Sequence, residues 1–202
     1  MVVECVVFDL DGVLCELDHP ARLARLASIS GRSAEEIHAA IWASGFEDQS
    51  DSGAISEDAY LRGFGERIGF ALTEQDWISG RRAGSKPIPE TLSMAERLAG
   101  EKRLALLTNN GLLLKRTLRS ILPEVAALFG PHAYVSAEFG VCKPDPEVYR
   151  RLCQKIGAAP ETTLMIDDRE ENIVGAVAAG LQGFLFEGHE ALDQELRRLG
   201  LA

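Results

Sequence analysis

The chain has 202 residues, of which 46% are hydrophobic and 26% are charged, as is ordinary for a globular protein. These values exclude a disordered or collagen-like chain, and the length fits one core with a modest insertion. The formal net charge of -10 makes nucleic acid and anionic lipid surfaces poor general partners, because like charges repel. The apolar run at the start is interrupted by Glu4 and is too short to cross a bilayer. We therefore expect a cytoplasmic protein that binds neither nucleic acid nor a membrane.

Short apolar runs that suit buried strands recur along the chain. They lie at Val2–Phe8, Arg103–Leu107, Ala133–Val135, Thr163–Ile166 and Gly183–Phe186. Helical patterns separate these runs, at Pro89–Gly100, Leu114–Leu122, Pro146–Ile156, Glu170–Ala179 and Glu190–Leu199. Strands that alternate with helices are typical of a parallel sheet with right-handed crossovers. The sequence therefore predicts an α/β fold.

The stretch from residue 16 to residue 85 breaks this alternation, because it contains helix signals and no convincing strand. Ser33 and Glu36 form a capping box at the start of one helix, and three further helices are expected around 21–28, 60–68 and Trp77. We expect a helical domain at 16–85, inserted into a core domain made of 1–15 and 86–202.

Two carboxylates follow the first predicted strand. Asp9 and Asp11 are two residues apart in an extended segment, so both side chains point the same way, and Gly12 allows a turn beneath them. In open α/β sheets, ligands bind beyond the carboxyl ends of the strands. A polar strand end followed by a turn would also explain this pair on its own.

Polar residues follow three more segments that would meet the same sheet edge. The second strand leads into Thr108 and Asn109 just before a helix start, where anions bind. Lys143 lies on a loop that two prolines stiffen, so its cation is held in one direction. Asp167 and Asp168 end another strand and provide the oxygen ligands that Mg²⁺ prefers. Since these acids would repel one another, we expect a metal ion and a phosphoryl group at this edge.

Four motifs carry a resemblance to a known family. They are FDLDGV at Phe8–Val13, LLTNNG at Leu106–Gly111, KPDPEVY at Lys143–Tyr149 and MIDDREENIVGA at Met165–Ala176. In this order they resemble the haloacid dehalogenase-like (HAD) superfamily, in particular its subgroup with a small helical (C1) cap after the first motif. The resemblance implies a Rossmann-like parallel sheet with an inserted helical cap, and a phosphatase-like activity.

The resemblance also implies a role for each site residue. Asp9 would be the nucleophile that forms an aspartyl phosphate, and Asp11 would be the general acid and base. Thr108 and the backbone of Asn109 would hold phosphoryl oxygens, while Lys143 would offset negative charge.

Magnesium is the cofactor that the resemblance implies. Its ligands would be Asp9, the backbone carbonyl of Asp11, and Asp168, with Asp167 binding directly or through a water. Asn172 would contact these ligands without binding the metal ion itself.

Three alternatives to a phosphatase follow from the same superfamily. Dehalogenases lack the second acid of the first motif, so Asp11 argues against them. Phosphomutases, including a phosphoglucomutase-like enzyme, need basic residues in the cap, for which His19, Arg22 and Arg25 are available. A catalytically idle binding module would have lost a motif acid, and none is lost. We expect a small-molecule phosphate ester as substrate, such as a sugar phosphate or a phosphoglycolate-like acid, and the sequence predicts no oligomeric state.

Overall fold

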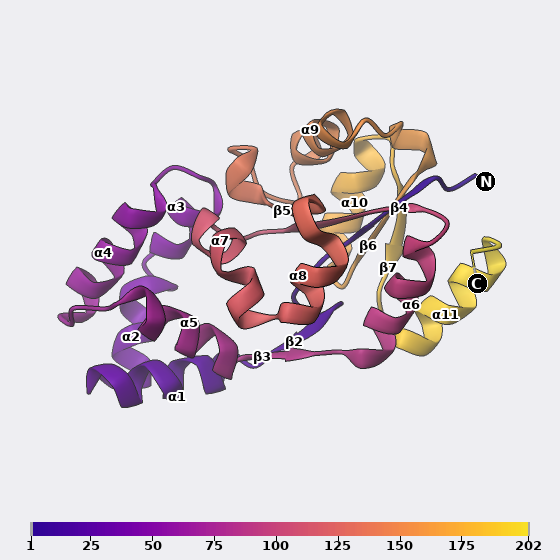
Figure 1. Cartoon of the computed structure of the whole chain (residues 1–202). Coiled ribbons are helices and arrows are strands. Elements are labelled where there is room, and N and C mark those ends of the chain that lie inside the picture. The colour runs from indigo at the N-terminus through magenta and orange to yellow at the C-terminus, as the bar shows by residue number, and fades with distance from the viewer. Residues whose placement is uncertain (1, 202) are drawn as a thin grey trace.

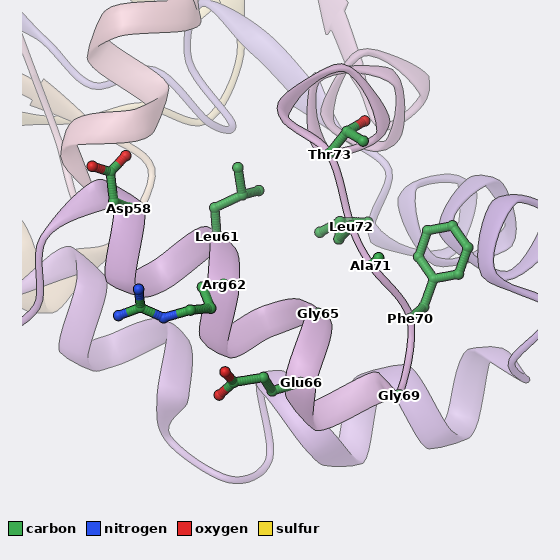
Figure 2. Close-up of a pocket in the computed structure, with 10 residues that line it drawn as sticks. All are labelled: Asp58, Leu61, Arg62, Gly65, Glu66, Gly69, Phe70, Ala71, Leu72 and Thr73. Atoms are coloured by element: carbon green, nitrogen blue, oxygen red, sulfur yellow. The ribbon is translucent and has the colours of Figure 1, made fainter.

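The computed structural model describes residues 2–201, and its centre is a five-stranded parallel sheet (Figure 1). The strand order is β5-β4-β1-β6-β7, so the first strand lies in the middle. The strands are β1 (Cys5–Phe8), β4 (Arg103–Thr108), β5 (Ala133–Val135), β6 (Thr163–Asp167) and β7 (Gln182–Leu185). All five correspond to the predicted runs, which confirms the α/β fold.

The middle strand is buried on both faces, and its alternate residues belong to two separate hydrophobic cores. Val6 and Phe8 pack into the larger core, and Cys5 and Val7 into the smaller one. Helices α6 (Pro89–Ala99), α7 (Leu112–Ile121), α8 (Pro123–Phe129) and α11 (His189–Arg198) supply the larger core, and α9 (Pro146–Ile156) and α10 (Glu170–Ala178) supply the smaller. Because both faces are covered, the strand reads as a continuous apolar run.

Five helices follow β1, in the stretch predicted to be inserted. They are α1 (His19–Ser30), α2 (Ala34–Ile41), α3 (Phe46–Asp51), α4 (Glu57–Ile68) and α5 (Glu74–Ala83). The capping box of Ser33 and Glu36 is present at the start of α2. We refer to residues 18–84 as the insert; in Figure 1 it lies at the end of the molecule away from both termini.

Several short elements were not predicted. The helices α3 and α8 have only six and seven residues, which is too few for an apolar stripe to show. The antiparallel strands β2 (Cys15–Leu17) and β3 (Ser85–Pro87) correct the expectation of no strand between residues 16 and 85. Three-residue strands carry no readable periodicity, because their pairing is fixed by a partner far away in the sequence. Single 3-10 turns lie at Gly130–His132, Ser136–Glu138 and Pro160–Thr162.

The ribbon formed by β2 and β3 lies where the chain enters and leaves the insert (Figure 1). The expected division into 1–15 with 86–202, and 16–85, falls within this ribbon, and we propose the ribbon as the boundary between core and insert. Across residues 2–201, no helix has both the length and the apolar character that crossing a bilayer requires.

Candidate active site

Three strands bring the predicted site residues to one edge of the sheet. Asp9 follows β1 directly, Thr108 is the last residue of β4, and Asp167 is the last residue of β6. The parallel register pairs Phe8 with both Leu106 and Ile166, so all three strands end at nearly the same level. A cavity of about 350 Å³ opens at this edge. Its lining contains Asp9, Asp11, Gly12, Leu17, Thr108, Asn109, Lys143, Asp168, Arg169 and Asn172.

Lys143 lies between two carboxylates at the base of the cavity. Its Nζ is 2.8 Å from Asp9 Oδ1 and 2.6 Å from Asp167 Oδ2. The loop that carries it is held by Asn109, whose side chain donates to the Lys143 carbonyl at 2.7 Å and accepts from its backbone N–H at 2.8 Å. The structure thus brings Lys143 to both acids, at the sheet edge where the sequence led us to expect it.

The charges in this group perturb one another strongly. Burial raises the pKa of the Asp9 carboxyl to about 7; Lys143 opposes this shift and the Asp167 carboxylate adds to it. Burial also favours the neutral form of Lys143, but Asp9 and Asp167 outweigh it and hold the pKa of the amine above its ordinary value. One cation thus faces two buried acids, and a further cation at the site would favour ionised Asp9.

Asp9, Asp167 and Asp168 offer carboxylate oxygens that all lie within 4.8 Å of one another. Asp167 is fully buried, and besides Lys143 its carboxylate accepts from the Arg169 N–H at 3.0 Å and from Asn172 Nδ2 at 2.8 Å. Asp168 is exposed and faces the cavity. Three oxygen donors at this spacing fit a hard divalent cation such as Mg²⁺.

The turn after β1 brings Asp168 close to Gly12. Gly12 has φ of +85°, and a Cβ there would lie 2.2 Å from Asp168 Oδ2. Only glycine therefore fits between the first motif and the last one.

Asp11 lines the same cavity, and its closest side-chain contact comes from the insert. Arg81 Nη2, from α5, lies 2.7 Å from both oxygens of the Asp11 carboxylate. Asn110 Nδ2 at 3.5 Å and Cys15 Sγ at 3.4 Å are more distant donors. Although burial pushes the pKa of the Asp11 carboxyl upward, the Arg81 guanidinium outweighs it and holds that pKa below its ordinary value.

Thr108 completes the set of predicted residues. Its hydroxyl oxygen accepts a hydrogen bond from Asn110 Nδ2 at 2.8 Å, and its side chain is almost completely buried at the cavity wall. Asn109, predicted to act through its backbone, uses its side chain to fix the Lys143 loop. All the predicted site residues therefore meet at one edge.

Two residues that contact Asp11 were not predicted, Asn110 and Arg81. Asn110 belongs to the predicted motif LLTNNG, but only the structure shows that its side-chain amide donates to both Thr108 and Asp11. The burial of Arg81 could have been predicted from the sequence, because it lies three residues after Ile78 and four after Trp77, on the apolar face of α5. An arginine on an apolar face is a candidate for a buried ion pair.

A parallel sheet with an acid pair, a hydroxyl, a lysine and a second acid pair at its carboxyl edge defines a class of hydrolases. The model of the haloacid dehalogenase-like hydrolase family matches residues 3–180, and the chain belongs to this family. Among curated relatives, a phosphatase of Mycobacterium tuberculosis is 28% identical over 198 residues, which cover 93% of this chain and 88% of that protein.

Solved structures share the fold. A predicted HAD-like hydrolase from Porphyromonas gingivalis superposes with a TM-score of 0.80 at 24% identity, covering 98% of this chain and 99% of that one. A HAD family enzyme from Bacteroides thetaiotaomicron, in complex with magnesium and inorganic phosphate, superposes with a TM-score of 0.74 at 22% identity. The superposition covers 91% of this chain and 93% of that enzyme. These likenesses support the fold over at least 91% of the chain.

Proposed function

We propose that the protein is a Mg²⁺-dependent phosphatase that hydrolyses a small phosphorylated metabolite through an aspartyl phosphate. The observation that carries this proposal is the placement of Lys143 between Asp9 and Asp167, beside Thr108, at the base of one small cavity. Phosphoryl transfer depends mainly on positioning and on neutralising charge, and this arrangement supplies both.

The proposed reaction has two steps. In the first, a carboxylate oxygen of Asp9 forms a bond to phosphorus while the ester P–O bond breaks, and Asp11 gives its proton to the departing alkoxide. In the second, Asp11 takes a proton from water, the water oxygen bonds to phosphorus, and the bond from phosphorus to Asp9 breaks. Inorganic phosphate leaves, and both carboxyl groups return to their starting state.

The residues around the nucleophile divide the remaining work. Thr108 and the Asn109 backbone hold phosphoryl oxygens, and Lys143 offsets the charge on Asp9 and on the phosphoryl group. We assign the magnesium to Asp9, Asp168 and the Asp11 backbone carbonyl, with Asp167 binding directly or through a water. When bound, the ion supplies charge neutralisation and alignment of the phosphoryl group.

The relatives support a phosphatase without naming its substrate. The Mycobacterium relative carries the name phosphatase, and a further relative, a sesquiterpene phosphatase of Aspergillus oryzae, is 26% identical over 97% of this chain and 96% of its own. The Bacteroides enzyme was crystallised with the ion and the product that we propose here. The cavity of about 350 Å³ favours a small substrate, such as a sugar phosphate or a phosphoglycolate-like acid.

The insert gives no support to a phosphomutase, which would need free cations for a second phosphate. Arg22 is buried, pairs with Glu47 at 3.4 Å and lies over the Trp42 ring. His19 Nε2 contacts His38 Nδ1 at 3.2 Å, and the Arg25 guanidinium donates to Ser79. The basic side chains considered from sequence are thus engaged within the insert.

A screen for phosphate release tests the proposal. The protein is incubated with some tens of phosphometabolites and with p-nitrophenyl phosphate, each with Mg²⁺ and with EDTA. We expect Mg²⁺-dependent release of inorganic phosphate that EDTA abolishes. Interconversion of sugar phosphates without phosphate release would indicate a mutase, and no turnover of any ester would contradict the proposal.

A further inference from the structure

The proposed acid and base is held by a side chain from the insert. Arg81 lies on α5, is 1% exposed, and is among the largest fully buried side chains of residues 2–201. Its Nη2 contacts both oxygens of the Asp11 carboxylate, across 70 residues of sequence. No other charged side chain hydrogen-bonds to Asp11 within residues 2–201.

Hydrogen bonds compensate the burial of this arginine only in part. Its Nε is buried and finds no hydrogen-bond partner among the residues that the structure describes. A buried guanidinium stabilises a fold only when its donors are satisfied, because removing the charge from water is costly. Arg22 Nε, also in the insert, is likewise buried without a partner among the described residues, so the contact with Asp11 is what distinguishes Arg81.

Close helix packing fixes the place from which Arg81 reaches the core. A Cβ at Gly80, the preceding residue, would lie 2.8 Å from Leu26 Cδ2 on α1. At Gly84, a Cβ would lie 2.6 Å from the carbonyl oxygen of Asp18. Both glycines let α5 approach α1 closely, so the guanidinium is carried by a rigid pair of helices rather than by a loop.

The insert touches the core at other points as well. Arg116 on α7 pairs with Glu57 at 2.7 Å and with Glu74 at 2.6 Å, and both acids belong to the insert. Ser136 Oγ donates to the Asp51 carbonyl at 2.6 Å. The ion pair between Arg81 and Asp11 thus belongs to the docked arrangement of the insert, and a displaced insert would take the guanidinium away from Asp11.

We propose that Arg81 is a positioning residue that holds the Asp11 carboxylate in place from the insert, so that proton transfer to the leaving group depends on the docked insert. This inference rests on the proposed function, in which Asp11 gives a proton to the leaving alcohol. Arg81 alone favours ionised Asp11, and the negative charge of the bound phosphate ester favours the protonated form that the first step needs. Arg81 acts through Asp11 and contacts neither Asp9 nor Lys143.

The leaving group distinguishes this role from a structural one. An alkyl phosphate needs a proton on its departing oxygen, whereas p-nitrophenyl phosphate has a stable leaving anion and needs none. Loss of Arg81 should therefore impair alkyl esters more than the aryl ester in kcat/KM, which reports the first phosphoryl transfer when that step is irreversible. General damage to the fold would lower both values equally.

The test compares Arg81→Met, Arg81→Lys and Arg82→Met in the full-length protein with Mg²⁺. Arg82 is the adjacent arginine on the same helix and is exposed, so its variant is the matched control. We expect Arg81→Met to lose at least about tenfold more kcat/KM on the alkyl ester than on p-nitrophenyl phosphate. Arg81→Lys should recover part of the difference, and Arg82→Met should match the parent protein. Equal losses on the two esters would overturn the inference.

A crystallographic comparison decides the inference even without turnover. The parent protein and Arg81→Met are crystallised with MgCl₂ and inorganic phosphate. We expect the Asp11 side chain to change rotamer or lose order only in Arg81→Met, and an unchanged Asp11 would overturn the inference. A parent protein that hydrolyses no ester would contradict the proposed function alone.

Discussion

Asp9 and Asp11 are two residues apart, yet their surroundings come from different parts of the chain. Within residues 2–201, the charged side chains closest to Asp9 come from the core: Lys143 lies on a core loop, and Asp167 is the last residue of β6. Asp11 takes its shortest contacts from Arg81 in the insert. The two environments also shift the pKa values in opposite directions, upward for Asp9 and downward for Asp11. Without a bound metal these shifts run opposite to the proposed roles, because a nucleophile acts ionised and a general acid acts protonated. A bound cation favours ionised Asp9, and the negative charge of a bound phosphate ester favours protonated Asp11. Separate regions of the molecule thus set the environments of the two carboxyl groups.

The largest effect is expected on the core side, at Asp9. Asp9→Asn should lower kcat by more than about a thousandfold, because the amide cannot attack phosphorus, while the near-identical shape preserves the fold. Phosphate release measures the loss of kcat, and far-UV circular dichroism measures whether the fold is preserved. Appreciable turnover by pure Asp9→Asn protein would remove Asp9 from the role of nucleophile.

Lys143 should show the next largest effect, on activity and on stability together. Lys143→Met leaves Asp9 and Asp167 facing each other without a cation, so the free energy of unfolding should fall by about 3–5 kcal/mol. We expect kcat to fall on the order of a hundredfold, through lost electrostatic stabilisation. Urea unfolding and steady-state kinetics measure these changes. Lys155→Met, at the exposed end of α9, is the control, and similar effects in both variants would contradict the assignment.

Magnesium and pH should act on the Asp9 side of the site together. The pKa of Asp9 is raised in the folded protein, so its contribution to stability is present at low pH and is lost as pH rises through about 7. Added Mg²⁺ should therefore raise the melting temperature more at pH 8 than at pH 5, and a concentration one hundred times the Kd contributes about 2.7 kcal/mol. Thermal unfolding with Mg²⁺ and with EDTA measures this, with Asp9→Asn as control. Equal shifts at both pH values would count against this site as the magnesium site.

The smallest effect is expected where the insert meets the core at the surface. Arg116 is 46% exposed, so its pairs with Glu57 and Glu74 are screened by water and salt. Arg116→Gln should lower the free energy of unfolding by about 0–1 kcal/mol, and less at 0.5 M NaCl than at low salt. Chemical unfolding at the two salt concentrations measures this. A loss as large as that of Lys143→Met would show that the surface contact, rather than the buried pair at Asp11, secures the insert.

The core side of the site was readable from sequence, for a physical reason. Its acids, threonine and lysine follow segments whose parallel pairing is set by apolar runs, so strand order alone brings them together. Short motifs placed Asp9 directly after one strand and Asp167 at the end of another.

The insert side was much less readable. The contact between Arg81 and Asp11 joins residues 70 apart and depends on how five helices pack, which no local pattern encodes. The short helix α3 and the ribbon of β2 and β3 were missed for the same reason, because their formation depends on distant partners. Arg81 and Arg82 look alike in sequence, and only the face of α5 on which each lies separates them.

The ribbon of β2 and β3 has a consequence for how such enzymes diversify. Hydrogen-bonded strands run about 5 Å apart, so another segment whose ends can be brought to that separation could join the core at Leu17 and Ser85 in place of the insert. A chimaera made this way would inherit its nucleophile from one parent and the partner of its acid-base aspartate from the other. If Arg81 positions Asp11 as proposed, exchange at the two strands of this one ribbon would change the preferred leaving group, while Asp9 and its phosphorylation chemistry stayed the same.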